Sequence, residues 1–356
     1  MTRFVQLHLL TSYPPSNLNR DDQGRPKTAL VGDANRLRIS SQSQKRAWRT
    51  SENFESAFAG HLGTRTKKMG QEVFKALKDG GIAGKPAREW AKEIANEFGK
   101  LKSEKKVEND QDLEIEQLVH ISPEENDAIN ALVATLVERK EGPTADELKL
   151  VCHSRRAVDI AMFGRMLASS PEFNADAAVQ VSHAITVHRA AVEDDYFSAV
   201  DDLNTREQSG ASHIGVRSYG AGLFYLYLCI DRELLKTNLG NDEALTTRAL
   251  EALVNAVTKV SPSGMQNSFA SRAYASYVLA EKGNQQPRSL AQAFLKPIKP
   301  YGDEDLFEKS VAALETRFKN FDAVYGSCAD KRYTVNVEAP TGNITDLVKF
   351  VAELVR

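Results

Sequence analysis

Residues 36–49 read Arg-Leu-Arg-Ile-Ser-Ser-Gln-Ser-Gln-Lys-Arg-Ala-Trp-Arg. We expect the first four of these residues to form a short strand. Ser41, with Gln44 three residues later, has the spacing of a capping box, which predicts a helix from residue 41 to about residue 59. The stretch therefore predicts a strand that leads directly into a helix.

The first 50 residues carry an excess of positive charge. They hold nine basic and three acidic side chains, a net of +6, whereas the whole chain has a formal net charge of -2. A local positive field in a nearly neutral protein is typical of a surface that binds a polyanion. Lys45 and Arg49 are four residues apart, so the helix would present both on one face. The hydroxyl and amide side chains of residues 40–44 suit phosphate oxygens and ribose hydroxyls.

Composition is ordinary for a folded soluble protein. The chain has 356 residues, of which 42% are hydrophobic and 26% charged, so it can bury a sizeable core. Its three cysteines, Cys152, Cys229 and Cys328, have no CxxC spacing, which favours a reducing cytoplasm. The N-terminus lacks a signal-peptide pattern and no apolar run reaches about 18 residues, so we expect neither secretion nor a membrane span.

Alternating apolar residues predict the strands. Residues 4–10 place Val5, Leu7 and Leu9 on one face, and the proline pair that follows Tyr13 should end this strand. Further strands are expected at residues 158–162, 179–187, 223–230, 274–280 and 331–337. The first two of these further strands would pair as a hairpin, with Gly164-Arg-Met166 at its tip.

Helical periodicity dominates residues 60–150, where helices are predicted at 71–78, 87–98 and 124–139. Three more helices are expected, at residues 242–260, 303–325 and 345–355. Residues 190–220 are polar and rich in Gly and Asp, and long excursions of this kind are usually functional or disordered. The pattern predicts an α+β fold with an antiparallel core, a helical insertion and a protruding loop.

Several motifs make the chain similar to a known family. They are Pro15-Ser-Asn-Leu-Asn-Arg-Asp-Asp22 with Lys27, Arg38-Ile-Ser-Ser-Gln-Ser-Gln-Lys-Arg-Ala47, Phe163-Gly-Arg-Met166, Ser182-His-Ala-Ile-Thr186 and Phe197-Ser-Ala-Val-Asp-Asp-Leu203. With them the chain resembles the CasC-type backbone subunit of the type I-E CRISPR Cascade complex. The resemblance covers most of the chain and is thin over residues 60–150 and after about residue 260.

The resemblance implies a hand-like subunit. A modified RRM (ferredoxin-like) antiparallel palm would comprise residues 1–59, 150–190 and 218–356. Residues 60–149 would form helical fingers, and residues 191–217 a β-hairpin-like thumb.

The resemblance also implies a function. Family members polymerise along the guide crRNA in several copies, hold its backbone and present its bases to complementary DNA, while each thumb flips out one base at regular intervals. The implied partners are crRNA, target DNA through the guide, other copies of the chain, and the large, small, 5′-end-capping and crRNA-processing subunits of Cascade. No cofactor, metal, catalytic residue or membrane partner is expected.

We expect cations near the N-terminus to contact phosphates, because a subunit that accepts any guide sequence must hold the backbone. The expected contacts are Arg20, Lys27, Arg38, Lys45 and Arg49. Ser40 and Gln42, at the start of the helix, would donate to phosphate beside the helix N-terminal amides. The alternatives are a solvated basic face for the cations and helix capping alone for the polar residues.

Two further groups complete the expected RNA site. At the predicted hairpin tip, Arg165 would pair with a phosphate and Met166 would wedge at a base step, although a Met near a strand end is more often core. In the thumb, Tyr196, Phe197 and Val200 would contact bases, since aromatic residues in a polar loop suit stacking. Family members carry Trp where Tyr196 stands. The alternative is that these thumb residues anchor a neighbouring subunit.

Adjacent carboxylates raise two other functions. Asp21-Asp22 and Asp201-Asp202 could hold Mg²⁺ for phosphodiester cleavage, as an acidic residue does in backbone subunits of the related type III complexes. The resemblance favours a structural role, in which Asp22 pairs with Arg20 or Arg25. The alternatives are therefore a metal-dependent RNase that uses Asp21 or Asp22, and a stand-alone regulatory RNA-binding protein.

Overall fold

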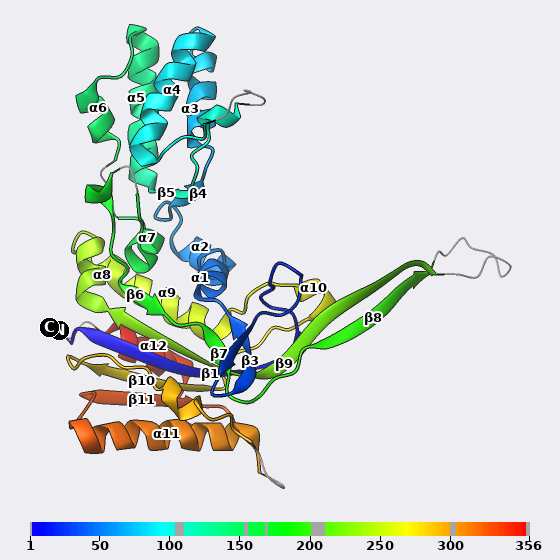
Figure 1. Ribbon diagram of the computed structural model, residues 1–356. Coiled ribbons are helices and arrows are strands. Elements are labelled where there is room, and N and C mark those ends of the chain that lie inside the picture. The colour runs from blue at the N-terminus through cyan, green and yellow to red at the C-terminus, as the bar shows by residue number, and fades with distance from the viewer. Residues whose placement is uncertain are drawn as a thin grey trace. The chain divides into compact units, whose positions relative to one another are not determined.

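A computed structural model describes residues 2–103, 110–152, 156–167, 170–200, 211–299 and 304–353 (Figure 1). The chain divides into two compact units. Unit 1 comprises Met1–Phe54, Gln180–Arg232 and Thr247–Arg356, and unit 2 comprises Glu55–Val179 and Glu233–Thr246.

Unit 1 is built on an antiparallel sheet whose strand order is β11-β10-β1-β9-β7-β3-β2, with β6 and β8 also paired to β9. The strands are β1 (Phe4–Ser16), β2 (Thr28–Val31), β3 (Ala34–Ile39), β6 (Val179–Val181), β7 (Ala184–Thr186), β8 (Glu193–Val200), β9 (Ala211–Asp231), β10 (Tyr277–Gly283) and β11 (Lys331–Asn336). Together with the helices this confirms the expected α+β class with an antiparallel sheet.

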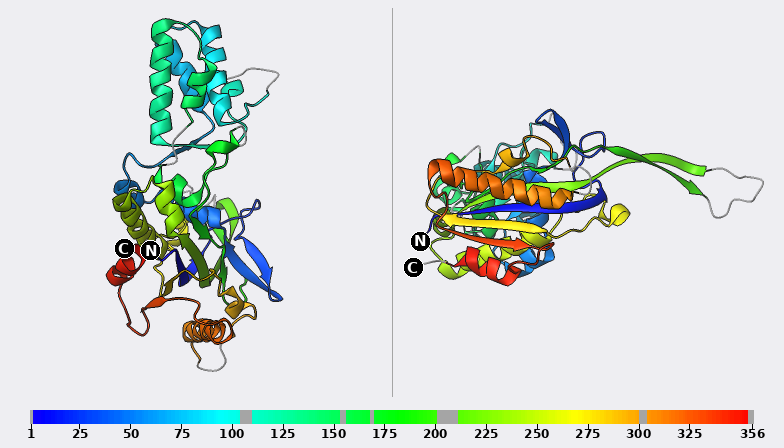
Figure 2. Two further views of the ribbon diagram at one scale, coloured as in Figure 1. Left: turned by 90° about the vertical axis from the view of Figure 1, so that its left-hand side faces the viewer. Right: turned by 90° about the horizontal axis from the view of Figure 1, so that it is seen from below.

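The sheet of unit 1 carries helices on both faces (Figure 2). On β10, Tyr277 and Glu281 point to the side of α11 (Leu306–Tyr325), where Tyr277 bonds Glu315 of that helix. Lys282 points to the other side and donates 3.1 Å to the carbonyl of Phe350 in α12 (Ile344–Ala352). Because both faces are covered, Gln6 and His8 of β1 are as buried as the apolar residues beside them.

Strand β1 runs past the prolines that were expected to end it. Its pairing with β9 continues to Ser16 after a register shift between Tyr13 and Ser16. An irregularity of this kind accommodates proline, which cannot donate to the ladder.

The remaining helices of unit 1 lie beside the sheet. They are α1 (Ser41–Arg49), the short α10 (Gln266–Phe269), the 3-10 turn η4 (Ala291–Phe294) and most of α9 (Glu243–Lys259). The helices α2 (Glu52–Ala57) and α8 (Arg232–Asn238) span the limits of the two units. The single helix expected over residues 41–59 is therefore two helices, α1 and α2. The N-cap of α1 is Ser40 rather than Ser41.

Unit 2 is mainly helical. It contains α3 (Met69–Asp79), α4 (Gly84–Phe98), α5 (Pro123–Arg139), α6 (Ala145–Leu150), α7 (Val158–Phe163), the two-stranded sheet β4 (Thr64–Thr66) and β5 (Val119–Ile121), and the 3-10 turns η1 (Gln111–Leu113) and η2 (Pro171–Phe173). One apolar core joins α3, α4 and α5 through residues such as Leu77, Ile94 and Leu136. This confirms the three helices predicted from periodicity.

Residues 158–163 form helix α7, so the strand expected there, and the hairpin with it, are wrong. Five residues are too few to separate a period of 2 from one of 3.6. Asp159, on this helix, is buried and accepts 2.9 Å from the amide of Gly63, a partner far away in the sequence. Among the helices that the structure describes, none is long and apolar enough to cross a membrane.

Candidate nucleic-acid interface

The loop from Asn17 to Lys27 is fixed by side-chain and backbone hydrogen bonds. The side-chain Nδ2 of Asn17 donates to the carbonyls of Gly24 and Ser218, both at 2.9 Å. The amide of Lys27 donates to the carbonyl of Asn19 at 2.8 Å. The Arg20 side chain is exposed, so it extends to solvent from an ordered loop rather than from a flexible one.

The same loop holds the start of α1. Asn19 Oδ1 accepts 2.8 Å from the amide of Ser40, and Ser40 Oγ caps the helix by accepting 3.3 Å from the amide of Ser43. Ser40 is buried, whereas Gln42 is exposed. Of the two polar residues expected to face phosphate, Gln42 is therefore the accessible one, and Ser40 serves the cap.

Lys45 and Arg49 lie one turn apart on α1, and both are half-buried. Burial lowers the pKa of the Lys45 ammonium. Trp48 and Gln44 on the same helix are buried, which sets the direction in which the two cations point. An anion that binds them would lie against this face of the helix.

A second group of cations lies where β3 meets β7. Arg38 Nη1 is 2.9 Å from His183 Nδ1, and the Arg38 amide donates 2.8 Å to the carbonyl of Lys27. Burial, and then the positive charges of Arg38 and Lys27, lower the pKa of His183. The neutral imidazole can then accept from Arg38, so the positive charge of this group belongs to the Arg and the Lys.

Arg36, two residues before Arg38 on the same strand, is used differently. Its guanidinium is fully buried and donates to the carbonyls of Thr186 at 2.8 Å and Phe294 at 2.9 Å. Residues two apart on a strand share a face, so the difference between the buried Arg36 and the more accessible Arg38 comes from the carbonyls of Thr186 and Phe294 that surround Arg36.

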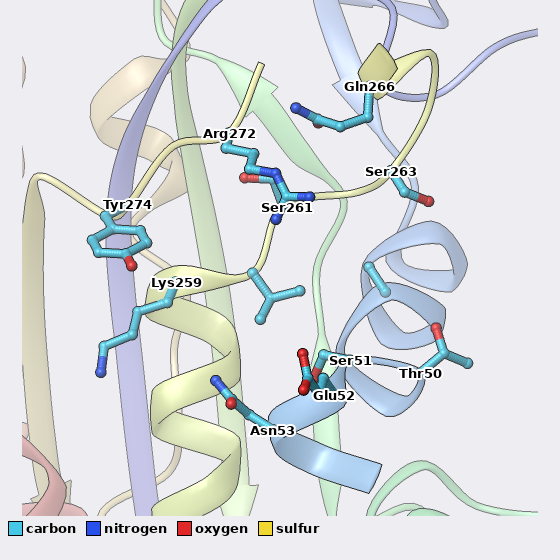
Figure 3. A pocket seen from close by; sticks show the side chains of 12 residues that line it. Thr50, Ser51, Glu52, Asn53, Lys259, Ser261, Ser263, Gln266, Arg272 and Tyr274 are labelled. Atoms are coloured by element: carbon cyan, nitrogen blue, oxygen red, sulfur yellow. The ribbon is translucent and has the colours of Figure 1, made fainter. Parts of the chain in front are cut away.

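Two hollows adjoin one another along α1. The first, of about 400 Å³, lies between Arg20 of the loop and Ser43 and Arg46 of the helix. The second, of about 420 Å³, shares Ala47, Thr50 and Ser263 with it (Figure 3). Both are lined largely by hydroxyl, amide and charged groups, the chemistry that binds a sugar-phosphate backbone.

The far wall of the second hollow was not expected from the sequence. It is formed by residues 259–274, which contribute Lys259, Gln266, Arg272 and Tyr274 (Figure 3). This segment passes so close to the basic loop that a Cβ at Gly264 would lie 2.4 Å from the carbonyl oxygen of Leu18. Gly264 is the local sequence feature that could have indicated this close approach, because only glycine fits there. The sequence alone does not show which segment approaches it.

Arg165 does not lie at a hairpin tip. Its side chain is 1% exposed, Nη1 lies 2.5 Å from Glu125 Oε2, and Nη2 donates 3.0 Å to the carbonyl of Phe173. The expected phosphate contact by Arg165 is wrong in this structure, because the guanidinium is used inside unit 2. The next residue, Met166, is 76% exposed and remains available as an apolar wedge.

The thumb residues lie on a two-stranded ribbon of β8 and β9 that projects from the sheet (Figure 1). Tyr196 is opposite Val216 and Phe197 is opposite Gly215, so the two aromatic side chains leave opposite faces. Tyr196 is 63% exposed. Val200 ends β8, but its side chain lies outside the described residues, as do Asp201 and Asp202.

The Asp21 carboxylate of the basic loop stabilises the loop itself. Asp21 Oδ1 accepts from the amides of Gln23 at 3.0 Å and Arg25 at 2.9 Å. Arg25 lies 3.7 Å from Asp194, and no ion pair with the exposed Asp22 is found among the described residues. Within the same described ranges, no three His, Cys, Asp or Glu side chains are grouped as metal ligands.

Comparisons with known proteins find a matching family model and similar solved structures. A family model described as "CT1975-like protein" matches residues 5–353. A chain of a solved structure described as "CRISPR RNA-guided surveillance complex, pre-nicking" is 29% identical with a TM-score of 0.83, and the match covers 98% of this chain and 100% of that one. A chain of a "CRISPR RNA-guided surveillance complex" is 25% identical with a TM-score of 0.72, covering 98% and 99%. A search of curated proteins found no match.

Proposed function

The chain belongs to the CT1975-like protein family, and we propose that it is a crRNA-binding backbone subunit of a type I-E Cascade surveillance complex. In this proposal it is not an enzyme. It polymerises along the guide in the cytoplasm, presents the guide to target DNA, and contacts copies of itself and the other Cascade subunits. The likeness to chains of two RNA-guided surveillance complexes supports a part in a complex of this kind.

One observation carries the backbone role. Cations of the loop and of α1 surround a polar groove, and the loop that positions them is held by backbone bonds and by Asn17 and Asn19. Contacts of this kind neutralise phosphates and read no bases, so they tolerate any guide sequence. A fixed loop also loses little conformational entropy when RNA binds.

The other parts have separate roles in the proposal. Unit 2 serves as the fingers and offers Met166 as a wedge at a base step, and the β8–β9 ribbon serves as the thumb. An exposed apolar side chain suits a wedge at a base step, and an exposed aromatic side chain suits the stacking of a base.

Charge reversal on α1 tests the proposal. We expect Lys45→Glu and Arg49→Glu to weaken guide RNA binding for every spacer sequence. Each should also lower the slope of log K against log salt by about 0.7, the value for one lost contact to a single strand. The measurement is RNA affinity at four salt concentrations, with size analysis of the assembled complex. Lys319→Glu, an exposed cation on α11, is the matched control.

Three results would count against the proposal. Unchanged affinity and slope in both variants would remove the face of α1 that carries Lys45 and Arg49 as an RNA contact. Cleavage of complementary RNA that requires Asp22 and Mg²⁺ would establish the RNase instead. A chain that purifies from cells with a CRISPR array but without uniform guide-length RNA would favour the stand-alone regulatory binder.

A further inference from the structure

The second hollow along α1 holds a carboxylate among its cations. Lys259 and Arg272 line one wall, and Glu52, at the start of α2, lines the other (Figure 3). The volume of about 420 Å³ lies in the range of pockets that take drug-sized molecules, so the hollow has room for one nucleotide of a strand. Like charges repel, so a phosphate of that nucleotide is the wrong partner for the carboxylate.

Several other polar groups of this hollow are used by the fold itself. The hydroxyls of Thr50 and Ser51 donate to backbone carbonyls of α1 at 2.8 and 2.7 Å. On the other wall, Ser261 Oγ donates 3.1 Å to the carbonyl of Ala273. These bonds hold the two walls in place, and they leave the longer side chains of the lining to meet a ligand.

Glu52 is available to such a ligand. Its side chain is exposed, and it has no hydrogen bond or ion pair with any residue that the structure describes. Lys259 is bonded instead to Asn255, one turn earlier on α9, with Nζ 2.7 Å from Oδ1. An ionised carboxylate only accepts hydrogen bonds, so the group that suits Glu52 is a donor such as a hydroxyl.

We propose that Glu52 recognises the sugar of the guide. Its carboxylate accepts a hydrogen bond from one ribose 2′-hydroxyl, and Arg272 contacts the phosphate beside that ribose. The inference rests on the proposed function, since it requires RNA in this groove, and it adds a residue that selects RNA over DNA. The 2′-hydroxyl is the group by which a protein distinguishes the two nucleic acids, and acidic side chains are recurrent partners of ribose hydroxyls.

Affinities of the full-length chain for three strands of one sequence test this assignment. The strands carry ribose, 2′-fluororibose or deoxyribose, and the 2′-fluorine keeps the sugar shape of RNA without donating a hydrogen bond. We expect Glu52→Ala to lower the preference for ribose over 2′-fluororibose by about tenfold, the scale of one hydrogen bond to a charged group. Glu52→Gln keeps a carbonyl acceptor at this position, so its preference should fall by less.

The deoxyribose strand gives a second readout. Glu52→Ala should bind it at least as tightly as the wild type does, because a charge that repels phosphate is gone. Glu55→Ala is the matched control, since Glu55 is an exposed carboxylate on the same short helix and does not line the hollow. It should leave the ratios of the three affinities unchanged. Thermal unfolding of each variant checks that the fold is retained.

The outcomes separate this inference from the proposed function. If Glu52→Ala changes all three affinities by the same factor, or by none, the ribose contact is wrong. If the ratios are unchanged but assembly of the complex is altered, the hollow binds a protein and the ribose contact is again wrong. In both cases the RNA-binding function stands. If the chain binds none of the strands, the proposed function itself has failed.

Discussion

The guanidinium carbon of Arg217 lies 4.6 Å from the centre of the Phe197 ring, on the face of the β8–β9 ribbon opposite Tyr196. Gly215 makes room for this ring, because a Cβ there would lie 2.5 Å from Phe197 Cζ. The adjacent aromatic residues of the thumb thus have different surroundings. Phe197 is held against the ribbon by a cation, and Tyr196 projects beside Val216.

This separation predicts independent effects of the two aromatic residues. We expect Phe197→Ala to weaken guide RNA binding by about 1–3 kcal/mol, the cost of one lost stack. In the double variant with Tyr196→Ala, the losses should add within about 0.5 kcal/mol, because side chains on opposite faces cannot share one base. A double-mutant cycle of RNA affinities measures this. A larger coupling energy would show that one base contacts both rings.

The wall formed by residues 259–274 predicts a contact with RNA beyond the motif residues. Arg272→Glu should reduce affinity for all guides and lower the salt slope by about 0.7, as a phosphate contact requires. Lys349→Glu, an exposed cation on α12, is the control. RNA binding at several salt concentrations is the measurement. An unchanged slope in Arg272→Glu would leave the second hollow outside the RNA path.

Arg165 and Met166 are neighbours in sequence with opposite expected phenotypes. Arg165→Met leaves the Glu125 carboxylate buried without its cation, which should destabilise the protein by about 3–5 kcal/mol. Met166→Ala removes an exposed side chain and should change the free energy of unfolding by less than about 0.5 kcal/mol. Urea unfolding of both variants decides this. Equal stability would contradict the buried ion pair.

The buried network under α11 predicts a loss of stability in acid. Burial lowers the pKa of His8, so this histidine is neutral in the fold. Burial would raise the pKa of Glu281, but hydrogen bonds from His8 and Arg288 outweigh burial and lower this pKa to about 2. In both cases the unfolded chain binds more protons, so stability rises with pH.

The two groups act in different pH windows. As pH falls below about 6.5, protonation of His8 in the unfolded chain begins to reduce stability, and below about 4.5 Glu281 adds to the loss. We expect thermal unfolding at pH 5.5 to occur below that at pH 7.5. In His8→Gln the difference should shrink, whereas His61→Gln, at an exposed site, should retain most of it. Equal shifts in both variants would contradict the role of His8.

The sequence allowed prediction of the features that depend on neighbouring residues. The long helices of unit 2 repeat an apolar stripe over several turns, and β1 alternates, so both follow from local patterns. The basic loop and α1 were recognised from motifs and charge. Their spatial association rests on a bond between Asn19 and Ser40, which no local pattern shows.

The failures at the candidate site share one physical cause, which is a partner distant in the sequence. Arg165 follows a glycine and precedes an exposed Met, yet Glu125, 40 residues earlier, draws it inside. Arg36 and Arg38 have the same local signature, but only Arg36 finds buried carbonyls, on Thr186 and Phe294. The segment around Arg272 lines the second hollow only because it lies close to the basic loop, which is distant in the sequence.

The side chain of Asn17 fixes the position of the basic loop relative to the β8–β9 ribbon. Its carboxamide donates hydrogen bonds both to the basic loop, at the Gly24 carbonyl, and to the root of the thumb, at the Ser218 carbonyl. The thumb root therefore cannot swing away without breaking a bond that also shapes the loop. Under the proposed function, the protein therefore sets the distance from Arg20 to that root, and a longer guide would bind more copies instead of lengthening the stretch of RNA that each copy holds.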